Sequence, residues 1–297
     1  MKLDDYRTSD NVGDQRGQSF GGGFGGGGGI FGLLFGLVLS RFGIVGVLIL
    51  LLGYCALSSL GGGSGLGLGG PGAAPHQASQ GAKTPAEACA VDAASRFSCQ
   101  VLASTEDTWT KIFAEQGQRY QPAGFIFYGP QGGSSGCGAA QSAMGPFYCP
   151  TDNKIYIDTN FYSELQSRFG AAGDFAQAYV IAHEIGHHIQ YLTGVLEQTG
   201  TAQQRLSSRE GNALQVRVEL QADCYAGVWA ARNQARLEPG DVEEGMKAAE
   251  AIGDDTLQKQ SQGVVVPESF THGTSAQRQE ALRRGLESGD PSQCRYS

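Results

Sequence analysis

The segment AYVIAHEIGHHIQYLTG, residues 178–194, contains three of the five histidines in this chain of 297 residues. His183 and His187 are four residues apart, and on a helix this spacing places both imidazoles on one face, close enough to bind one metal ion. Glu184 directly follows the first histidine, and its side chain points about 100° around the helix. It can therefore reach a metal-bound water without being a ligand. This H-E-x-x-H pattern predicts two zinc ligands and one general base.

The alternative is that these are ordinary polar residues on a helix, because the three fixed residues also occur together by chance. The neighbouring sequence favours a packed, metal-binding helix. Gly186 allows another element to approach closely, and Gly194 is typical of a helix end. Apolar residues recur at the packing positions of the same helix: Phe175, Ala178, Ala182, Ile185 and Ile189.

A catalytic zinc needs a third protein ligand and one open position for water. No histidine follows at the short spacing that H-x-x-G-x-x-H would require. The segment RVELQADCYAGVW, residues 217–229, instead places Glu219 and Asp223 four residues apart on one helix face. We expect Glu219 to be the third ligand and Asp223 to contact a ligand histidine from behind, which fixes its tautomer. A solvated acidic face is the alternative, but the neighbouring residues are mostly apolar.

Two further histidines have different expectations. His188 is rotated away from the metal face, so we expect a structural role for it. His272 lies in ESFTHGTSAQRQEAL, residues 268–282, just before a helix with Ser275 as its expected N-cap. It is a candidate catalytic residue that stabilises the oxyanion of a tetrahedral intermediate, and the alternative is an ordinary loop histidine. Arg278 could orient such a group or pair with a carboxylate.

Residues 1–85 have the composition of an N-terminal segment that anchors a protein to a membrane. Residues 1–29 are polar and then almost pure glycine, which predicts a flexible arm. Residues 30–60 are apolar and predict one transmembrane helix, with a core span of 19 uncharged residues at 42–60. Residues 61–85 are a glycine-rich linker, and residues 86–297 form the domain.

The charges around the apolar segment predict its orientation. Lys2, Arg7, Arg16 and Arg41 precede the span, and no Lys or Arg follows before Lys83. The positive-inside rule then places the N-terminus in the cytoplasm of a bacterium and the domain on the periplasmic side of the cell membrane. A cleaved signal peptide is the alternative, and the long polar arm argues against it.

The cysteines agree with export. Six lie beyond the span, and an even number in an exported domain suggests disulfides. Local spacing favours Cys89–Cys99 and Cys137–Cys149, which leaves Cys224–Cys294. A cysteine metal site is disfavoured, because no C-x-x-C pair occurs. The net charge of −8 disfavours binding to nucleic acid.

Strand patterns come first in the domain and helical patterns follow, which predicts an α+β class, mostly helical with a small antiparallel sheet. Apolar and alternating runs at 124–129, 147–149 and 154–158 are the expected strands, the last two as a hairpin. We expect the 154–158 strand to be the sheet edge on which a peptide lies. The principal expected helices cover residues 105–116, 174–193, 207–235, 241–253 and 275–287.

Four segments, HEIGHH, RVELQADCYAGVW, FTHGTSAQR and the N-terminal SDNVGDQRG, resemble the bacterial putative neutral zinc metallopeptidase family. The resemblance implies a zincin-like fold in which an H-E-x-x-H helix and a later E-x-x-x-D helix share the zinc. It maps this arrangement onto His183, Glu184, His187, Glu219 and Asp223. The late histidine and arginine are also similar to the His-Pro-x-x-x-x-Arg element of membrane-associated zinc peptidases. Here Gly273 replaces the proline, and Arg278 comes one residue later.

The expected function is a membrane-anchored zinc endopeptidase that acts on peptide or protein substrates. Zinc on His183, His187 and Glu219 lowers the pKa of its bound water to about 7. Glu184 takes the proton, delivers hydroxide to the peptide carbonyl and protonates the leaving amine. One alternative is a non-catalytic envelope scaffold with structural zinc, which needs no base at position 184. Another is a zinc amidase acting on cell-wall peptides.

Overall fold

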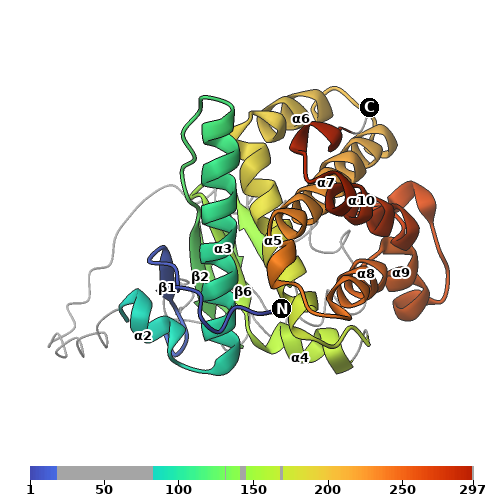
Figure 1. Ribbon diagram of the computed structural model, residues 1–297. Helices are drawn as coiled ribbons and strands as arrows, with labels where there is room; N and C mark the ends of the chain where they lie inside the picture. Colours follow the sequence, from blue (N-terminus) through green and yellow to red (C-terminus); the bar gives the residue numbers. More distant parts are fainter. Residues whose placement is uncertain (19–82, 131, 141–144, 168–169, 296–297) are drawn as a thin grey trace, which may run out of the picture. The chain divides into compact units, whose positions relative to one another are not determined.

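The computed structural model describes residues 1–18, 83–130, 132–140, 145–167 and 170–295 (Figure 1). The expected transmembrane segment 30–60 and most of the expected linker lie outside these residues. Among the helices in the described part, none is long and apolar enough to span a membrane. The described residues form one compact unit.

The central sheet has four strands in the order β1-β2-β6-β5: Val12–Asp14, Gly124–Tyr128, Lys154–Asp158 and Phe147–Cys149. β1 pairs with β2 in parallel, β2 pairs with β6 in parallel, and only β5 and β6 are antiparallel. A separate antiparallel ribbon joins β3 (Gly133–Ser135) to β4 (Gly138–Ala140). The α+β class and the 147–158 hairpin are confirmed. The expectation of an antiparallel sheet is wrong. β2 and β6 are parallel neighbours in the sheet, although β3, β4 and β5 lie between them in the chain.

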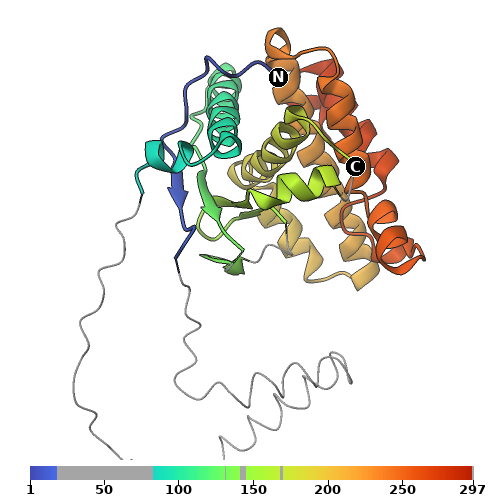
Figure 2. The same cartoon turned by 90° about the horizontal axis from the view of Figure 1, so that it is seen from below.

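Side chains on both faces of the sheet are buried, because successive residues of a strand point to opposite faces. Phe125 and Phe127 of β2 and Ile155 and Ile157 of β6 face the main core with the helices. Tyr128 and Tyr156 face the other side, in a smaller cluster that includes residues of the β3–β4 ribbon and β5. Figure 2 shows helices over one face of the sheet only.

The N-terminal residues belong to this folded unit. Met1, Leu3 and Val12 are buried in the main core, and Val12 lies opposite Phe125 in the β1–β2 pair. The expectation of a flexible arm over 1–29 is therefore wrong for residues 1–18. A strand of three residues shows no periodicity, and its pairing depends on backbone hydrogen bonds that any sequence can supply.

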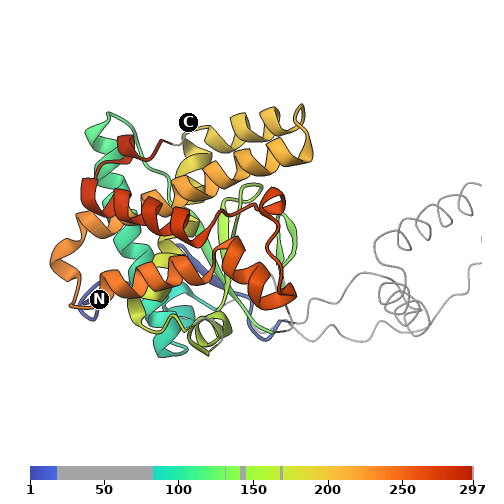
Figure 3. The same cartoon turned by 90° about the vertical axis from the view of Figure 1, so that its right-hand side faces the viewer.

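Helices contain most of the residues in regular secondary structure. In chain order they are α2 (Pro85–Cys89), α3 (Ala93–Glu115), α4 (Asn160–Ser167), α5 (Asp174–Leu192), α6 (Val195–Gln203), α7 (Ser208–Arg232), α8 (Asp241–Ala251), α9 (Asp254–Gln262) and α10 (Ser275–Ser288). Short 3₁₀ turns lie at Gln234–Arg236, Pro267–Ser269 and Pro291–Gln293. α5 packs against α3 on one side and α7 on the other, and α6 lies beside the first half of α7 (Figure 3). Ser207 and Thr274 close capping boxes at the starts of α7 and α10, so Thr274 is the N-cap where Ser275 was expected.

All three expected disulfides are confirmed. Cys89–Cys99 joins α2 to α3, and Cys137–Cys149 joins the β3–β4 turn to β5. Cys224–Cys294 joins the middle of α7 to the residues after α10. The last bond spans 70 residues of sequence, so it restricts the unfolded chain most.

α7 and α10 cross with their backbones in close contact. A Cβ added at Gly285 of α10 would overlap the carbonyl oxygen of Cys224, and one added at Gly227 of α7 would overlap that of Leu282. Neither glycine is needed for its backbone angles, because neither has a positive φ. Their role is to let the two helices approach each other.

Gly285→Ala should therefore destabilise the protein by about 1–3 kcal/mol, since the methyl group forces the two backbones apart. The matched control is Gly200→Ala in α6, where an added Cβ meets nothing within 4 Å. Alanine should stabilise that helix by up to about 1 kcal/mol. Urea unfolding of the two variants measures the difference. Equal stability of Gly285→Ala and wild type would contradict the close crossing.

Candidate metal centre

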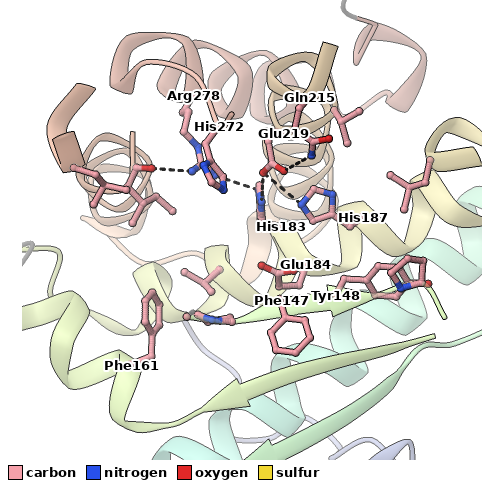
Figure 4. Close-up of a pocket in the computed structure, with 18 of the residues that line it drawn as sticks. Phe147, Tyr148, Phe161, His183, Glu184, His187, Gln215, Glu219, His272 and Arg278 are labelled. Carbon is pink, nitrogen blue, oxygen red and sulfur yellow. Dashed lines mark hydrogen bonds and ion pairs between the residues drawn. The ribbon is translucent and has the colours of Figure 1, made fainter. Parts of the chain in front are cut away.

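The site forms where α5 crosses α7. A Cβ at Gly186 would lie 2.8 Å from the Cα and carbonyl oxygen of Ala222, so α5 meets α7 with no side chain between them. This approach brings His183 and His187 of α5 against Glu219 of α7 (Figure 4). Glu219 lies at least 32 residues after the two histidines in the sequence, so only the packing of α5 against α7 brings it to them.

The donor atoms of this trio have the spacing of a zinc site. Oε2 of Glu219 lies 3.3 Å from Nε2 of His183 and 3.5 Å from Nε2 of His187. In a tetrahedral zinc site with bonds of about 2.1 Å, neighbouring ligand atoms lie about 3.4 Å apart. Two imidazoles and one carboxylate are also a donor set that zinc prefers. The residues present therefore fit a zinc ion with one position left for water.

The imidazoles are held with their Nε2 atoms toward the site. His183 donates Nδ1–H to Oδ1 of Asp223 over 2.7 Å, and His187 donates Nδ1–H to the side-chain oxygen of Gln190 over 2.9 Å. These partners fix both tautomers, as outer contacts of metal ligands usually do. Gln215 donates to the second oxygen of Glu219 over 3.0 Å.

Asp223 is the centre of a buried network. Arg278 contacts both oxygens of its carboxylate at 2.9 Å, and the Tyr179 hydroxyl donates to Oδ1 over 2.6 Å. Burial by itself would raise the pKa of Asp223, but the Arg278 guanidinium and the His183 imidazole outweigh it and lower that pKa to about 2. Asp223 is thus an ionised carboxylate that accepts from His183.

Tyr179, Gln190 and Gln215 contribute to the site but were not predicted from the sequence. Gln215 lies four residues before Glu219 and Gln190 lies three residues after His187, whereas Tyr179 bonds Asp223 on another helix. That spacing was a signal for the two glutamines, but glutamine and tyrosine are common on helix faces without such a role.

Glu184 faces an open cavity beside the trio. The cavity has a volume of about 610 Å³ and is lined by His183, Glu184, His187 and Glu219. The Glu184 side chain is mostly buried, yet within the described residues its carboxylate makes no hydrogen bond or ion pair. Figure 4 shows it on the side of the two imidazoles that faces Phe147. Its oxygens are thus available to a water or a substrate.

Apolar side chains from several elements form part of the cavity wall. They include Phe147 and Tyr148 of β5, Phe161 of α4, Leu196 and Leu257. β5 is at the edge of the sheet, whereas β6, the 154–158 strand, lies inside it between β2 and β5. The expectation that the 154–158 strand is the peptide-binding edge is therefore wrong, because the hairpin's first strand is the outer one.

The two remaining histidines of the domain lie differently. His188 is buried and donates Nε2–H to the carbonyl oxygen of Gln121 over 2.7 Å, while its Nδ1 lies 3.1 Å from the Tyr148 hydroxyl. Burial lowers the pKa of His188. It joins α5 to the sheet and does not line the cavity. His272 does line it, with a side chain that is 48% exposed.

Comparison with known proteins agrees with this geometry. The family model described as "Putative neutral zinc metallopeptidase" matches residues 1–296. The chain belongs to this family. The protein YpfJ of Escherichia coli strain K12 is 54% identical over 205 residues, which cover 68% of this chain and 71% of YpfJ. Rv2575 of Mycobacterium tuberculosis is 43% identical over 218 residues, with the same shares covered. No solved structure matches the chain.

Glu219→Ala should remove most of the zinc from the full-length protein, because two imidazoles alone bind the ion weakly. The affinity for zinc should fall by more than about 100-fold, because loss of a residue that only hydrogen-bonds a ligand already lowers the affinity by up to about that factor. Zinc per chain, measured by mass spectrometry of metals after dialysis, gives the result. The control is Glu243→Ala on the exposed side of α8, which should keep one zinc. Full retention of zinc in Glu219→Ala would place the third ligand elsewhere.

Proposed function

We propose that this protein is a membrane-anchored zinc endopeptidase with a zincin-like domain that faces an extracytoplasmic compartment. One observation carries the proposal: the Glu184 carboxylate has no partner among the residues that the structure describes, and it lines an open cavity beside His183, His187 and Glu219. Membership of a zinc metallopeptidase family supports it.

His183, His187 and Glu219 would hold the zinc. Within the described residues no fourth histidine, cysteine or carboxylate joins this trio. Structural zinc sites are normally closed by four protein ligands, so three ligands beside a cavity favour the catalytic kind. When bound, zinc supplies a Lewis acid that lowers the pKa of water to about 7 and polarises a carbonyl group.

Glu184 acts as the general base and then as the general acid. It accepts a proton from the attacking water and passes the proton to the nitrogen of the leaving amine. Asp223 and Gln190 keep the ligand imidazoles in place during these transfers, and Gln215 holds Glu219. A non-catalytic scaffold would have no use for a free carboxylate at position 184.

The substrate is proposed to be an extended polypeptide that lies along β5. An edge strand offers backbone groups to which a peptide can add as a further strand. Phe147 and Tyr148 of β5 and Phe161 of α4 line the cavity and would contact its apolar side chains. The three disulfides support an oxidising, extracytoplasmic compartment. The apolar residues 30–60 would attach the protein to the membrane.

Glu184→Gln tests the mechanism. The amide keeps the shape of the side chain but cannot accept the proton, so turnover should fall by about 10²–10⁴-fold while zinc content is unchanged. Cleavage of a mixed peptide library by the full-length protein, followed by mass spectrometry, measures turnover. Glu197→Gln, an exposed position of α6, is the control. Wild-type rates in Glu184→Gln would refute the assigned base.

A muropeptide digest distinguishes the cell-wall amidase from the protein endopeptidase, because both would use the same metal site. Cleavage of muropeptides with no cleavage of the peptide library would favour the amidase. Zinc binding with neither activity would favour the scaffold.

A further inference from the structure

Asp254 holds the loop that carries His272. It lies in the first turn of α9, and one oxygen of its carboxylate accepts the backbone N–H groups of Thr271, His272 and Gly273 over 2.7, 2.6 and 3.0 Å. Its own N–H donates to the carbonyl oxygen of Gly273 over 2.9 Å. Asp254 is buried, so this is a built contact rather than a surface one.

The other oxygen of Asp254 faces the imidazole. Oδ1 lies 3.2 Å from Nδ1 of His272. Burial opposes ionisation of Asp254, but the hydrogen bonds from His272 and Gly273 outweigh it and lower its pKa. An ionised carboxylate only accepts hydrogen bonds, so a hydrogen bond between Asp254 and Nδ1 requires the hydrogen on Nδ1, and the Thr271 hydroxyl at 3.1 Å can then accept from Nδ1 as well. Nε2 is then the nitrogen of His272 that remains for other partners.

His272 is placed where its Nε2 atom could contact a substrate in the cavity. His272 lines the same cavity as Glu184, and in Figure 4 its ring and the Glu184 carboxylate lie on opposite sides of His183. A peptide carbonyl attacked from the Glu184 side would have its oxygen on the far side. A donor there stabilises the negative charge that develops on that oxygen.

We propose that Asp254 is a positioning residue that fixes His272 with Nδ1–H toward the carboxylate and Nε2 toward the scissile carbonyl of the substrate. When both of its nitrogens carry hydrogen, His272 can donate Nε2–H to the carbonyl oxygen, and it makes or breaks no covalent bond. This inference rests on the proposed peptidase function for its catalytic part. The arrangement of Asp254 and His272 can be tested without that function.

The first experiment reads the histidine tautomers directly. Full-length protein with ¹⁵N-labelled histidine gives long-range nitrogen–proton NMR spectra, and His272→Gln identifies the signals of His272. We expect a hydrogen on Nδ1 in wild type, in the neutral ring and in the imidazolium alike. Asp254→Asn keeps an oxygen for the three backbone N–H groups but turns an NH₂ group toward Nδ1, so His272 should change to the Nε2-protonated tautomer.

Asp255→Asn is the matched control. Asp255 accepts the N–H and hydroxyl of Ser275 over 2.7 and 2.8 Å and has no bond to His272. It should leave the His272 spectrum as in wild type. An Nε2-protonated neutral His272 in wild type, or an unchanged spectrum in Asp254→Asn, would overturn the proposal.

The second experiment tests the catalytic part. Asp254→Asn should lower kcat about 10-fold or more with KM and zinc content unchanged, and it should have no further effect in a His272→Gln background. An equal loss in both backgrounds would mean that Asp254 only supports the loop. If wild type cleaves no peptide, the proposed function fails, and the tautomer experiment still decides whether Asp254 fixes His272.

A second inference rests on β1 and its neighbours. Residues 12–14 pair with residues 125–127 of β2, and the N–H of Ser9 donates to the carbonyl oxygen of Cys99 over 3.1 Å. Asp14, buried in the structure, forms ion pairs with Arg16 at 2.8 Å and with Lys83 at 2.9 Å. The residues on both sides of the segment 19–82 are therefore parts of one folded unit.

We infer that residues 1–18 lie on the same side of the membrane as the metal centre, because both belong to one folded unit. The expected placement of the N-terminus in the cytoplasm and the domain outside would remove β1 from the sheet and separate Asp14 from Lys83. The basic residues counted for orientation have other partners, since Arg7 pairs with Asp107 at 2.6 Å and Arg16 with Asp14.

Thiol labelling in intact cells tests this topology. Asp10→Cys and Glu287→Cys place single cysteines at exposed positions of the N-terminal segment and of α10 in the full-length protein. Labelling of both by an impermeant maleimide before lysis is the expected result. Labelling of position 287 alone would overturn the inference. Labelling of neither before lysis, and of both after it, would support the shared side and overturn only the extracytoplasmic location.

Discussion

The contact between Asp223 and Arg278 joins the three helices on which the metal centre depends. Asp223 is fully buried and belongs to α7, Arg278 belongs to α10, and His183 and Tyr179 reach the same carboxylate from α5. Removing one partner of such a buried pair costs about 3–5 kcal/mol, because a charge is left without compensation. The pair therefore holds the helix packing and the His183 tautomer by the same contacts.

Close backbone crossings make that contact possible. Gly186 lets α5 meet α7, and Gly227 with Gly285 lets α7 meet α10. With larger residues at these points, the helices would separate, and Glu219 could not lie 3.3 Å from His183. The glycines are thus part of the metal centre, although none of them is a ligand.

The side of the metal centre that faces β5 is open to a substrate. Three ligands are held from behind by Asp223, Gln190 and Gln215, while Glu184 and the aromatic wall of β5 face the cavity. The sheet places this wall, and the sheet in turn includes β1 from the N-terminal residues. The metal centre and the start of the chain are therefore parts of one structure, which is what restricts the membrane topology.

The sequence by itself determined the features that depend on local spacing. The two helices that carry His183, Glu184, His187, Glu219 and Asp223 follow from periodicity, and the three disulfides from the count and spacing of the cysteines. Only the tertiary structure decided the features that depend on distant partners. β1 pairs through its backbone with a strand more than 100 residues later, and β5 rather than β6 is the edge because β2 occupies the other side of β6. Asp254 and Arg278 find His272 and Asp223 only after α9 and α10 have packed, because no short-range pattern links a carboxylate to a partner on another helix.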